Sequence, residues 1–185
     1  MRAVLTPPSP SEYGSFYEKY ITTVREEDLA DVLAAQPEIL RAAAETLSEE
    51  AALRRYAPGK WSVKEVVGHL VDAERIFSYR ALRIGRGDAT PLAAFSENDY
   101  VAAADFDRMP MGDLVDDFST ARLQTLAILR SFASDDLTRL GTASNHPIST
   151  RALFYIVGGH VRHHLRLLAS HYGIPIAASE APAEG

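Results

Sequence analysis

Apolar residues recur every three or four positions in four separate segments of the chain, and this repetition limits the folds that it can adopt. The segments begin near residues 28, 62, 112 and 149, and no alternating pattern typical of half-buried strands lies between them. A helix with one apolar face is stable when that face packs against another element. The sequence therefore predicts an all-α fold, an antiparallel four-helix bundle over residues 28–175.

The second of these segments has a well-defined start. Ser62 is followed three residues later by Glu65, which is the spacing of a capping box. Trp61, just before this box, can pack onto Val66 as a hydrophobic staple. We expect this helix to run to about Ile84, because glycines follow it.

The other three helices have weaker boundary signals. Pro37 falls inside the first helix and predicts that it is kinked or restarts there, because proline has no amide hydrogen to donate. The third helix is expected over residues 112–133. Ser149 is positioned to cap the fourth helix, which should end at Tyr172 because Gly173 follows.

Three segments lie outside the predicted helices. Residues 1–27 are expected to form an irregular arm that aromatic side chains hold against the bundle. Residues 85–111 connect the second helix to the third and are longer than a bundle requires, which indicates a packed functional loop or a lid. Residues 176–185 are rich in Ala, Pro and Glu and are predicted to be a flexible tail. The aromatic residues of the arm are Tyr13, Phe16, Tyr17 and Tyr20.

Charge and composition exclude several classes of function. The formal net charge is -6 and the basic residues are interspersed with acidic ones, so the sequence predicts no nucleic-acid partner. Prolines stand where a signal peptide needs an apolar run, and no segment approaches the roughly 20 apolar residues of a membrane span. We expect a soluble, cytoplasmic protein with no membrane partner. Because the chain has no cysteine, a metal site must use nitrogen or oxygen ligands.

Two histidines lie on the face of the fourth helix that is expected to point into the bundle. His160 and His164 continue an apolar seam formed by Leu153, Val157 and Leu167, at alternating spacings of four and three. Because imidazoles at positions i and i+4 share one helix face, this pair could chelate a single ion. The alternative is a pair of core histidines hydrogen-bonded to neighbours, since buried polar groups are costly when unsatisfied.

His69, in the second helix, could supply a third ligand, although a single core histidine is the alternative. It lies beside Gly68, which is expected to let a neighbouring helix approach closely. Three histidines with one open position are typical of catalytic zinc sites, and imidazole also binds nickel, copper, iron and cobalt. His163 competes as a ligand because it lies three residues after His160. We expect His163, and His146 in a predicted loop, to lie outside the site.

Charged residues that follow His69 in the second helix are candidates for a chemical role. Asp72 lies three residues after His69 and could orient an imidazole or act on a metal-bound water. A solvated position at the edge of the helix is the alternative for Asp72. Arg80 and Arg83 could meet an anionic group of a substrate, although arginines more often line a helix surface.

Two runs of the sequence resemble the DinB/YfiT-like superfamily of small bacterial metalloproteins. These are W-S-x-x-E-x-x-x-H-L, which ends at Leu70, and G-H-x-x-x-H, which ends at His164. The similarity extends over roughly residues 13–172. The resemblance implies an up-down-down-up four-helix bundle and a divalent metal ion, zinc or nickel, bound by His69, His160 and His164. It also implies a homodimer.

The resemblance leaves three functions open. In the first, the metal ion binds a low-molecular-weight thiol for transfer to a small-molecule substrate, and Asn98 and Tyr100 of the long connection help to form the pocket. In the second, the ion activates water for hydrolysis, and Asp72 or another carboxylate moves the proton. The third is a metal-dependent binding or stress-response protein without turnover, which a site closed by a fourth protein ligand would favour.

Overall fold

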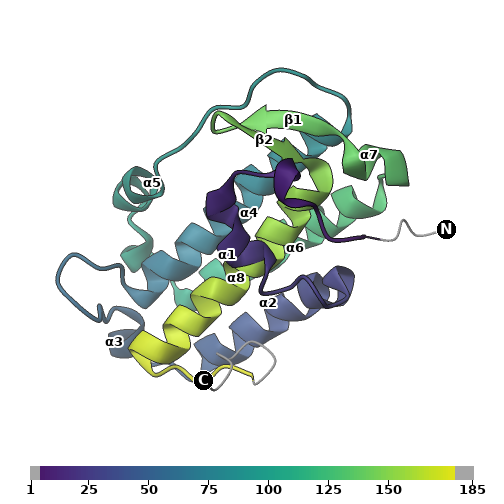
Figure 1. Cartoon of the computed structure of the whole chain (residues 1–185). Helices are drawn as coiled ribbons and strands as arrows, with labels where there is room; N and C mark the ends of the chain where they lie inside the picture. The colour runs from purple at the N-terminus through teal and green to yellow at the C-terminus, as the bar shows by residue number, and fades with distance from the viewer. Residues whose placement is uncertain (1–4, 178–185) are drawn as a thin grey trace.

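The computed structural model of the chain describes residues 5–177, and Figure 1 shows long helices packed side by side with smaller elements around them. The four-helix bundle predicted from the sequence is confirmed. The long helices are α2 (Leu29–Glu45), α4 (Val63–Gly85), α6 (Met111–Arg130) and α8 (Thr150–Tyr172). The smaller elements are the 3₁₀ helices η1 (Pro10–Glu12), η2 (Ser15–Tyr17) and η3 (Phe106–Arg108), the helices α1 (Glu18–Ile21), α3 (Glu49–Ala52), α5 (Glu97–Ala104) and α7 (Ser134–Thr138), and the strands β1 (Leu140–Ala143) and β2 (His146–Ser149).

The four long helices run in an up-down-down-up order. Arg86, just after α4, donates to the hydroxyl of Ser131, just after α6, over 2.8 Å, so α4 and α6 are parallel. Tyr172, at the end of α8, donates to the carbonyl oxygen of Trp61 before α4, so α8 runs opposite to α4. Ala43, near the end of α2, packs in one apolar cluster with Tyr172, which makes α2 parallel to α8. The parallel pair α4 and α6 requires the long crossover through α5 that Figure 1 shows.

The predicted ends of the second and fourth helices are confirmed. The Ser62 hydroxyl accepts from the backbone amide of Glu65 at 3.0 Å, and the Glu65 carboxylate accepts from the amide of Ser62 at 2.7 Å. Ser149 caps α8 with its side chain, and Gly173 ends this helix in the left-handed conformation, at φ 68°. The third helix ends earlier than expected, at Arg130.

Pro37 does not interrupt the first helix, so the predicted restart is wrong. Helix α2 continues from Leu29 to Glu45 through this proline. Because Pro37 has no amide hydrogen, the carbonyl oxygen of Leu33, one turn earlier, has no donor within the helix. The buried Arg122 of α6 donates to that oxygen at 2.9 Å. A tertiary contact thus replaces the missing helical hydrogen bond.

A small β-hairpin, which the sequence pattern did not predict, precedes α8. Strands β1 and β2 are antiparallel, and Ala143 is paired with His146. The two residues between the strands, Ser144 and Asn145, have positive φ values of 52° and 64°. This conformation joins two strands with the right-handed twist that hairpins favour. His146 therefore belongs to a strand and not to a loop, and its ring packs against Phe16 with centroids 5.4 Å apart.

The crossover between α4 and α6 is packed along most of its length. Leu92 donates its amide to the carbonyl oxygen of Thr142 at 2.9 Å and accepts from the amide of Ser144 at 3.0 Å, so it lies beside the hairpin. Phe106, in η3, packs directly over Gly68 of α4. A Cβ atom at Gly68 would lie 2.4 Å from this ring. The expected role of Gly68 is therefore corrected, since it makes room for an aromatic ring of the crossover and not for another helix.

The N-terminal arm contains short helical turns that pack on α8. Tyr13 and Tyr17 are buried, whereas Phe16 is 48% exposed. Gly159 of α8 lets the arm approach, because a Cβ atom there would lie 2.0 Å from the carbonyl oxygen of Tyr20. Most of the predicted tail, residues 176–185, lies outside the described residues.

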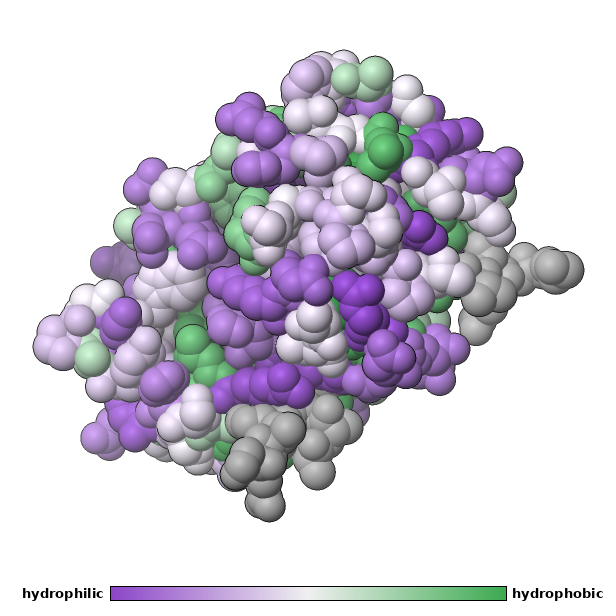
Figure 2. Space-filling model, viewed as in Figure 1, coloured by the Kyte–Doolittle hydropathy of each residue, from purple (hydrophilic) through white to green (hydrophobic). Residues whose placement is uncertain are grey.

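The surface has no large apolar face on the side that α1 and α8 occupy. Figure 2 shows strongly hydrophilic residues across the middle of this side, with apolar residues in small separate groups. The apolar core lies between the long helices, where Phe118, Phe154 and Leu165 have no exposed surface. None of the helices in the described part of the chain is both long and apolar enough to cross a membrane.

Candidate metal centre

Three histidines from two helices meet inside the bundle. His69 comes from α4, and His160 and His164 come from successive turns of α8. The Nε2 atom of His160 lies 3.0 Å from Nε2 of His69 and 3.2 Å from Nε2 of His164. All three side chains are buried, with exposed fractions of 3%, 5% and 7% in sequence order. The structure thus brings together the three histidines that the sequence singled out.

The spacing of these nitrogen atoms fits one bound ion. Zinc–nitrogen bonds of about 2.0–2.1 Å at tetrahedral angles place two ligand nitrogens roughly 3.3 Å apart. The Nε2 atoms of this cluster are separated by nearly that distance. The ligand atoms of the three histidines all lie within 4.8 Å of one another. Zinc, nickel, copper, iron and cobalt all accept imidazole, so the donor set does not select among them.

The surroundings keep the three imidazoles neutral. Burial lowers the pKa of His69 to about 4. Burial, together with the charges of neighbouring imidazoles, lowers the pKa of His160 and of His164 well below the usual range. Neutral imidazole is the form that binds metal ions. The Nδ1 atom of His164 is buried without a hydrogen-bond partner, so hydrogen bonding within the core leaves one nitrogen of this ring unsatisfied.

Aromatic rings hold the imidazoles in position. Tyr20 of α1 and Phe77 of α4 contact the His160 ring edge to face, with centroid distances of 5.3 and 5.9 Å. Trp61 lies 4.9 Å from the His69 ring. Such contacts restrict ring rotation and exclude water from the cluster.

The cluster lies against a cavity of about 360 Å³. His69 and His160 form part of the wall, which is otherwise largely aromatic. The charged residues of the wall are Arg80, Glu97 and Lys19. A cavity of this size and composition suits a small organic molecule. The other residues of the wall are Phe16, Tyr17, Tyr20, Ala73, Phe77, Ala94, Phe95 and Ser144.

The two crossover residues expected at the pocket, Asn98 and Tyr100, line different cavities. Asn98 lines a smaller cavity of about 200 Å³, together with His164 and Trp61. Tyr100 lines a third cavity, of about 500 Å³, which also contains Arg80. Two residues apart on α5, these side chains cannot face the same direction. Neither of them reaches the wall formed by the imidazoles of the larger, 360 Å³ cavity.

Asp72 lies away from the imidazoles, although it is only one helical turn from His69. Its carboxylate is paired with Arg75 at 3.9 Å, and burial raises its pKa. It lines neither of the cavities that touch the histidines. His163 also lies outside the cluster, half-buried, with its ring 5.4 Å from that of Tyr20.

The sequence did not indicate that Arg80 is buried or that Glu97 lines the same cavity as His69 and His160. Arg80 is only 2% exposed, in contrast to the helix-surface position that is usual for arginine. Glu97 reaches the cavity because the crossover folds back over α4, a long-range arrangement that local patterns do not encode. No motif marks either residue.

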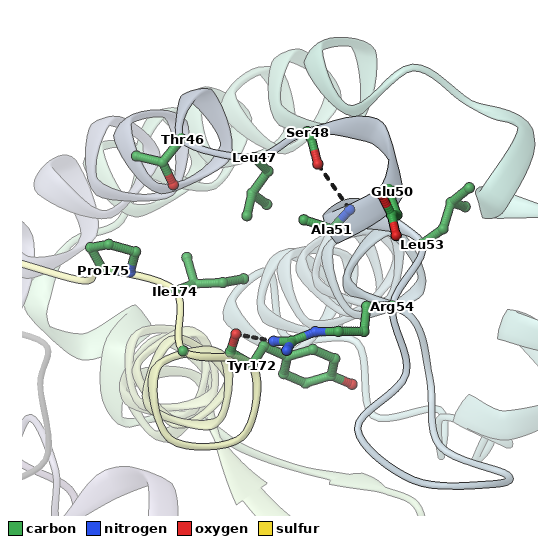
Figure 3. Close-up of a pocket in the computed structure, with 11 residues that line it drawn as sticks. Thr46, Leu47, Ser48, Glu50, Ala51, Leu53, Arg54, Tyr172, Ile174 and Pro175 are labelled. Carbon is green, nitrogen blue, oxygen red and sulfur yellow. Dashed lines mark hydrogen bonds between the residues drawn. The ribbon is translucent and has the colours of Figure 1, made fainter.

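A larger cavity, of about 800 Å³, lies at one end of the bundle (Figure 3). Its wall includes Leu47 and Ile174, and Arg54 donates to the carbonyl oxygen of Tyr172 beside it. None of the clustered histidines lines this cavity. Volume alone therefore does not identify the functional site.

A four-helix bundle with three convergent, buried histidines defines a helical protein with a candidate metal centre. The sequence model of the DinB superfamily matches residues 33–168. The chain belongs to this family.

Similar proteins cover most of the chain. A Bacillus licheniformis protein named "Putative metal-dependent hydrolase" is 28% identical over 145 residues, which are 73% of this chain and 78% of that protein. A Geobacillus thermodenitrificans protein of the same name is 27% identical over 153 residues, 79% of this chain and 85% of that one. The structure of YfiT from Bacillus subtilis, described as a probable metal-dependent hydrolase with an unusual four-helix bundle topology, superposes with a TM-score of 0.70. That likeness, at 20% identity over 91% of this chain and 94% of YfiT, shows a shared fold.

Proposed function

We propose that the chain is a metal-dependent enzyme in which His69, His160 and His164 hold one divalent ion beside the 360 Å³ cavity. The observation that carries this proposal is the convergence of three buried Nε2 atoms, two of which belong to histidines in the wall of this cavity. The names of the two similar bacterial proteins, both metal-dependent hydrolases, support it.

The chain itself supplies ligands, a dry site and a binding surface. A divalent ion held by three imidazoles supplies Lewis acidity, which lowers the pKa of water or of a thiol at its open position. Tyr20, Phe77 and Trp61 pack against the imidazole rings and restrict their rotation. The aromatic wall of the cavity binds the apolar part of a substrate.

Hydrolysis is the first reaction class that we propose. It requires a group that accepts a proton from the attacking water. Glu97 is the carboxylate in the cavity wall, and it comes from the crossover, opposite the helices that carry the histidines. We assign it this role in place of Asp72, which is paired with Arg75 away from the cavity.

Transfer of a low-molecular-weight thiol is the second class. The specific observation in its favour is that Glu97 is the single carboxylate of the wall and is exposed on the surface of α5. A thiol would need no such base, because a bound divalent cation would lower the pKa of the thiol and its proton would pass to solvent at neutral pH. The chain has no cysteine, so the thiol would have to be a separate molecule.

The two classes can be separated with protein loaded with zinc or nickel. A panel of p-nitrophenyl esters is tested without thiol, and chlorodinitrobenzene is tested with and without cysteine or glutathione. Glu97→Gln should reduce ester hydrolysis and leave thiol transfer unchanged, and Asp99→Asn, on the same helix, is the matched control. Product formation that depends on the thiol alone would favour transfer. Full metal occupancy with no turnover in either assay would contradict an enzymatic role.

A further inference from the structure

Arg80 is a buried cation without a carboxylate partner. Its Nη2 atom donates to the carbonyl oxygen of Ala93 at 2.7 Å and to the hydroxyl of Ser144 at 3.2 Å, and both acceptors are neutral. Its Nη1 atom is buried without a hydrogen-bond partner, and the neutral hydroxyl of Tyr17 lies close enough for Arg80 to oppose the rise that burial causes in the pKa of Tyr17. Among the described residues, no ion pair includes Arg80. A buried guanidinium is costly unless its charge and its donors are both matched.

The same bundle neutralises another buried arginine in full. Arg122, which has no exposed surface, donates to both carboxylate oxygens of Glu74, at 2.7 and 2.9 Å. The chain thus provides an internal anion for Arg122 and none for Arg80. The guanidinium of Arg80 is therefore available to an anionic group of a molecule in the cavity.

The guanidinium of Arg80 is held in place at the wall that also contains the imidazoles. Its Cζ atom lies 5.8 Å from the ring centroid of Phe77 and 5.7 Å from that of Phe95. These rings, together with the two hydrogen bonds of Nη2, limit the movement of the side chain. Arg80, His69 and His160 line one cavity of about 360 Å³, so a small molecule can contact all three.

We propose that Arg80 binds the carboxylate of a substrate whose reactive group lies at the histidines. This inference rests on the proposed function, because it places the substrate in the same cavity. One unpartnered Nη1 donor and one buried positive charge match a monoanion. A phosphate dianion fits less well, because the charged residues of the wall, Arg80, Lys19 and Glu97, together carry one net positive charge.

The proposal can be tested by binding of benzoate and of its neutral analogue benzamide. Both are titrated by NMR into the full chain after removal of metal with a chelator, so that neither can bind to a metal ion. Benzoate should bind at least tenfold more tightly than benzamide. Arg80→Gln should weaken benzoate binding at least tenfold, Arg80→Lys should weaken it less, and Arg83→Gln should leave it unchanged, because Arg83 is paired with Asp88 outside this cavity.

Equal binding of benzoate and benzamide to the natural chain would overturn the proposal. Full benzoate affinity in folded Arg80→Gln protein would also overturn it. Inorganic phosphate and acetate are then compared as competitors of benzoate. If phosphate displaces benzoate at a lower concentration than acetate does, the preference for a carboxylate is overturned.

Metal content, measured separately, distinguishes the two proposals. Benzoate binding that depends on Arg80 in a chain that takes up no metal would refute only the metal site, and metal uptake with benzoate binding indifferent to Arg80 would refute only the anion site.

Discussion

Two buried polar clusters of the described bundle, one around Arg122 and one of histidines, differ in their hydrogen bonding. Only in the Arg122 cluster are the charges and hydrogen bonds matched by residues of the cluster itself. Arg122 donates to Glu74, to the side-chain oxygen of Gln36 at 2.8 Å and to the carbonyl oxygen of Leu33 at 2.9 Å. The hydroxyl of Thr125 donates to the same carboxylate at 2.6 Å. Charges and hydrogen bonds are therefore matched within this cluster, and packing of α2, α4 and α6 accounts for it.

The histidine cluster lacks this internal matching. His69, His160 and His164 are three like groups that turn the same atom toward one another, and the second nitrogen of His164 has no partner. The fold alone does not explain why such groups are buried. The comparison teaches that like groups whose nitrogen atoms converge, with one ring nitrogen unpartnered, indicate a ligand, whereas groups whose charges and hydrogen bonds are matched indicate structure.

The largest expected effect is a loss of stability when the Arg122 cluster loses its carboxylate. Glu74→Ala leaves the Arg122 guanidinium buried and unpaired, which should lower the free energy of unfolding by about 3–5 kcal/mol. Urea unfolding measures this loss. Asp116→Ala, which removes an exposed ion pair with Arg41, should cost about 1 kcal/mol or less. Metal affinity should be unchanged in folded Glu74→Ala protein, and a parallel loss of affinity would show that the two clusters are not independent.

Acidification should lower the free energy of unfolding of the metal-free protein, because the histidine cluster becomes protonated on unfolding. The pKa of His69 in the folded chain, about 4, lies below the 6.5 of an unperturbed imidazole, so below pH 6.5 the unfolded chain binds a proton that the folded chain does not. The contribution of His69 to the free energy of unfolding is then fully present above about pH 6.5 and is lost as the pH falls toward 4. For His69 the full loss is about 3 kcal/mol, and His160 and His164 act in the same direction.

Urea unfolding of metal-free protein between pH 7.5 and 4.5 measures this dependence. The His69→Leu variant should show a shallower loss over the same range, because it lacks one of the groups that must become protonated. An equal slope in both proteins would mean that folding does not lower the pKa of His69.

The smallest expected effect is on the stability of a histidine variant, and it tests most directly the difference between the histidine cluster and the Arg122 cluster. His164→Leu removes an imidazole whose Nδ1 atom is unpartnered, so the metal-free variant should be as stable as the natural chain or more stable by about 1 kcal/mol. Gln36→Leu is the matched control, because its amide donates to the carbonyl oxygen of Gly158 at 2.8 Å and its loss should destabilise the chain. Thermal unfolding compares the two. A large loss of stability in metal-free His164→Leu would indicate a structural role for this histidine.

Local signals were sufficient for the caps of α4 and α8 and for the shared helix face of His160 and His164. The capping box of Ser62 and Glu65 and the cap at Ser149 depend on residues within one turn, so the sequence predicted them correctly. The i and i+4 spacing of His160 and His164 likewise determines that they share a helix face. The up-down-down-up order, by contrast, was implied by family resemblance and not by periodicity.

Contacts between segments that are distant in the sequence could not be predicted from local patterns. Pro37 does not break α2 because Arg122, 85 positions later in the numbering, replaces the missing bond. The hairpin strands are only four residues long, too short for a clear alternating pattern. Asn98 and Tyr100 fall on separate cavities because α5 turns them apart. Each of these outcomes depends on how the chain packs.

Metal analysis of the purified chain, without an affinity tag and after zinc or nickel is offered, tests the central claim most directly. The natural chain and folded Glu74→Ala protein should each retain one ion per chain. His69→Ala, His160→Ala and His164→Ala should each retain little or none, because every one of them removes a ligand. A natural chain that takes up no ion, or histidine variants that retain it, would contradict the assignment of the cluster as a metal centre.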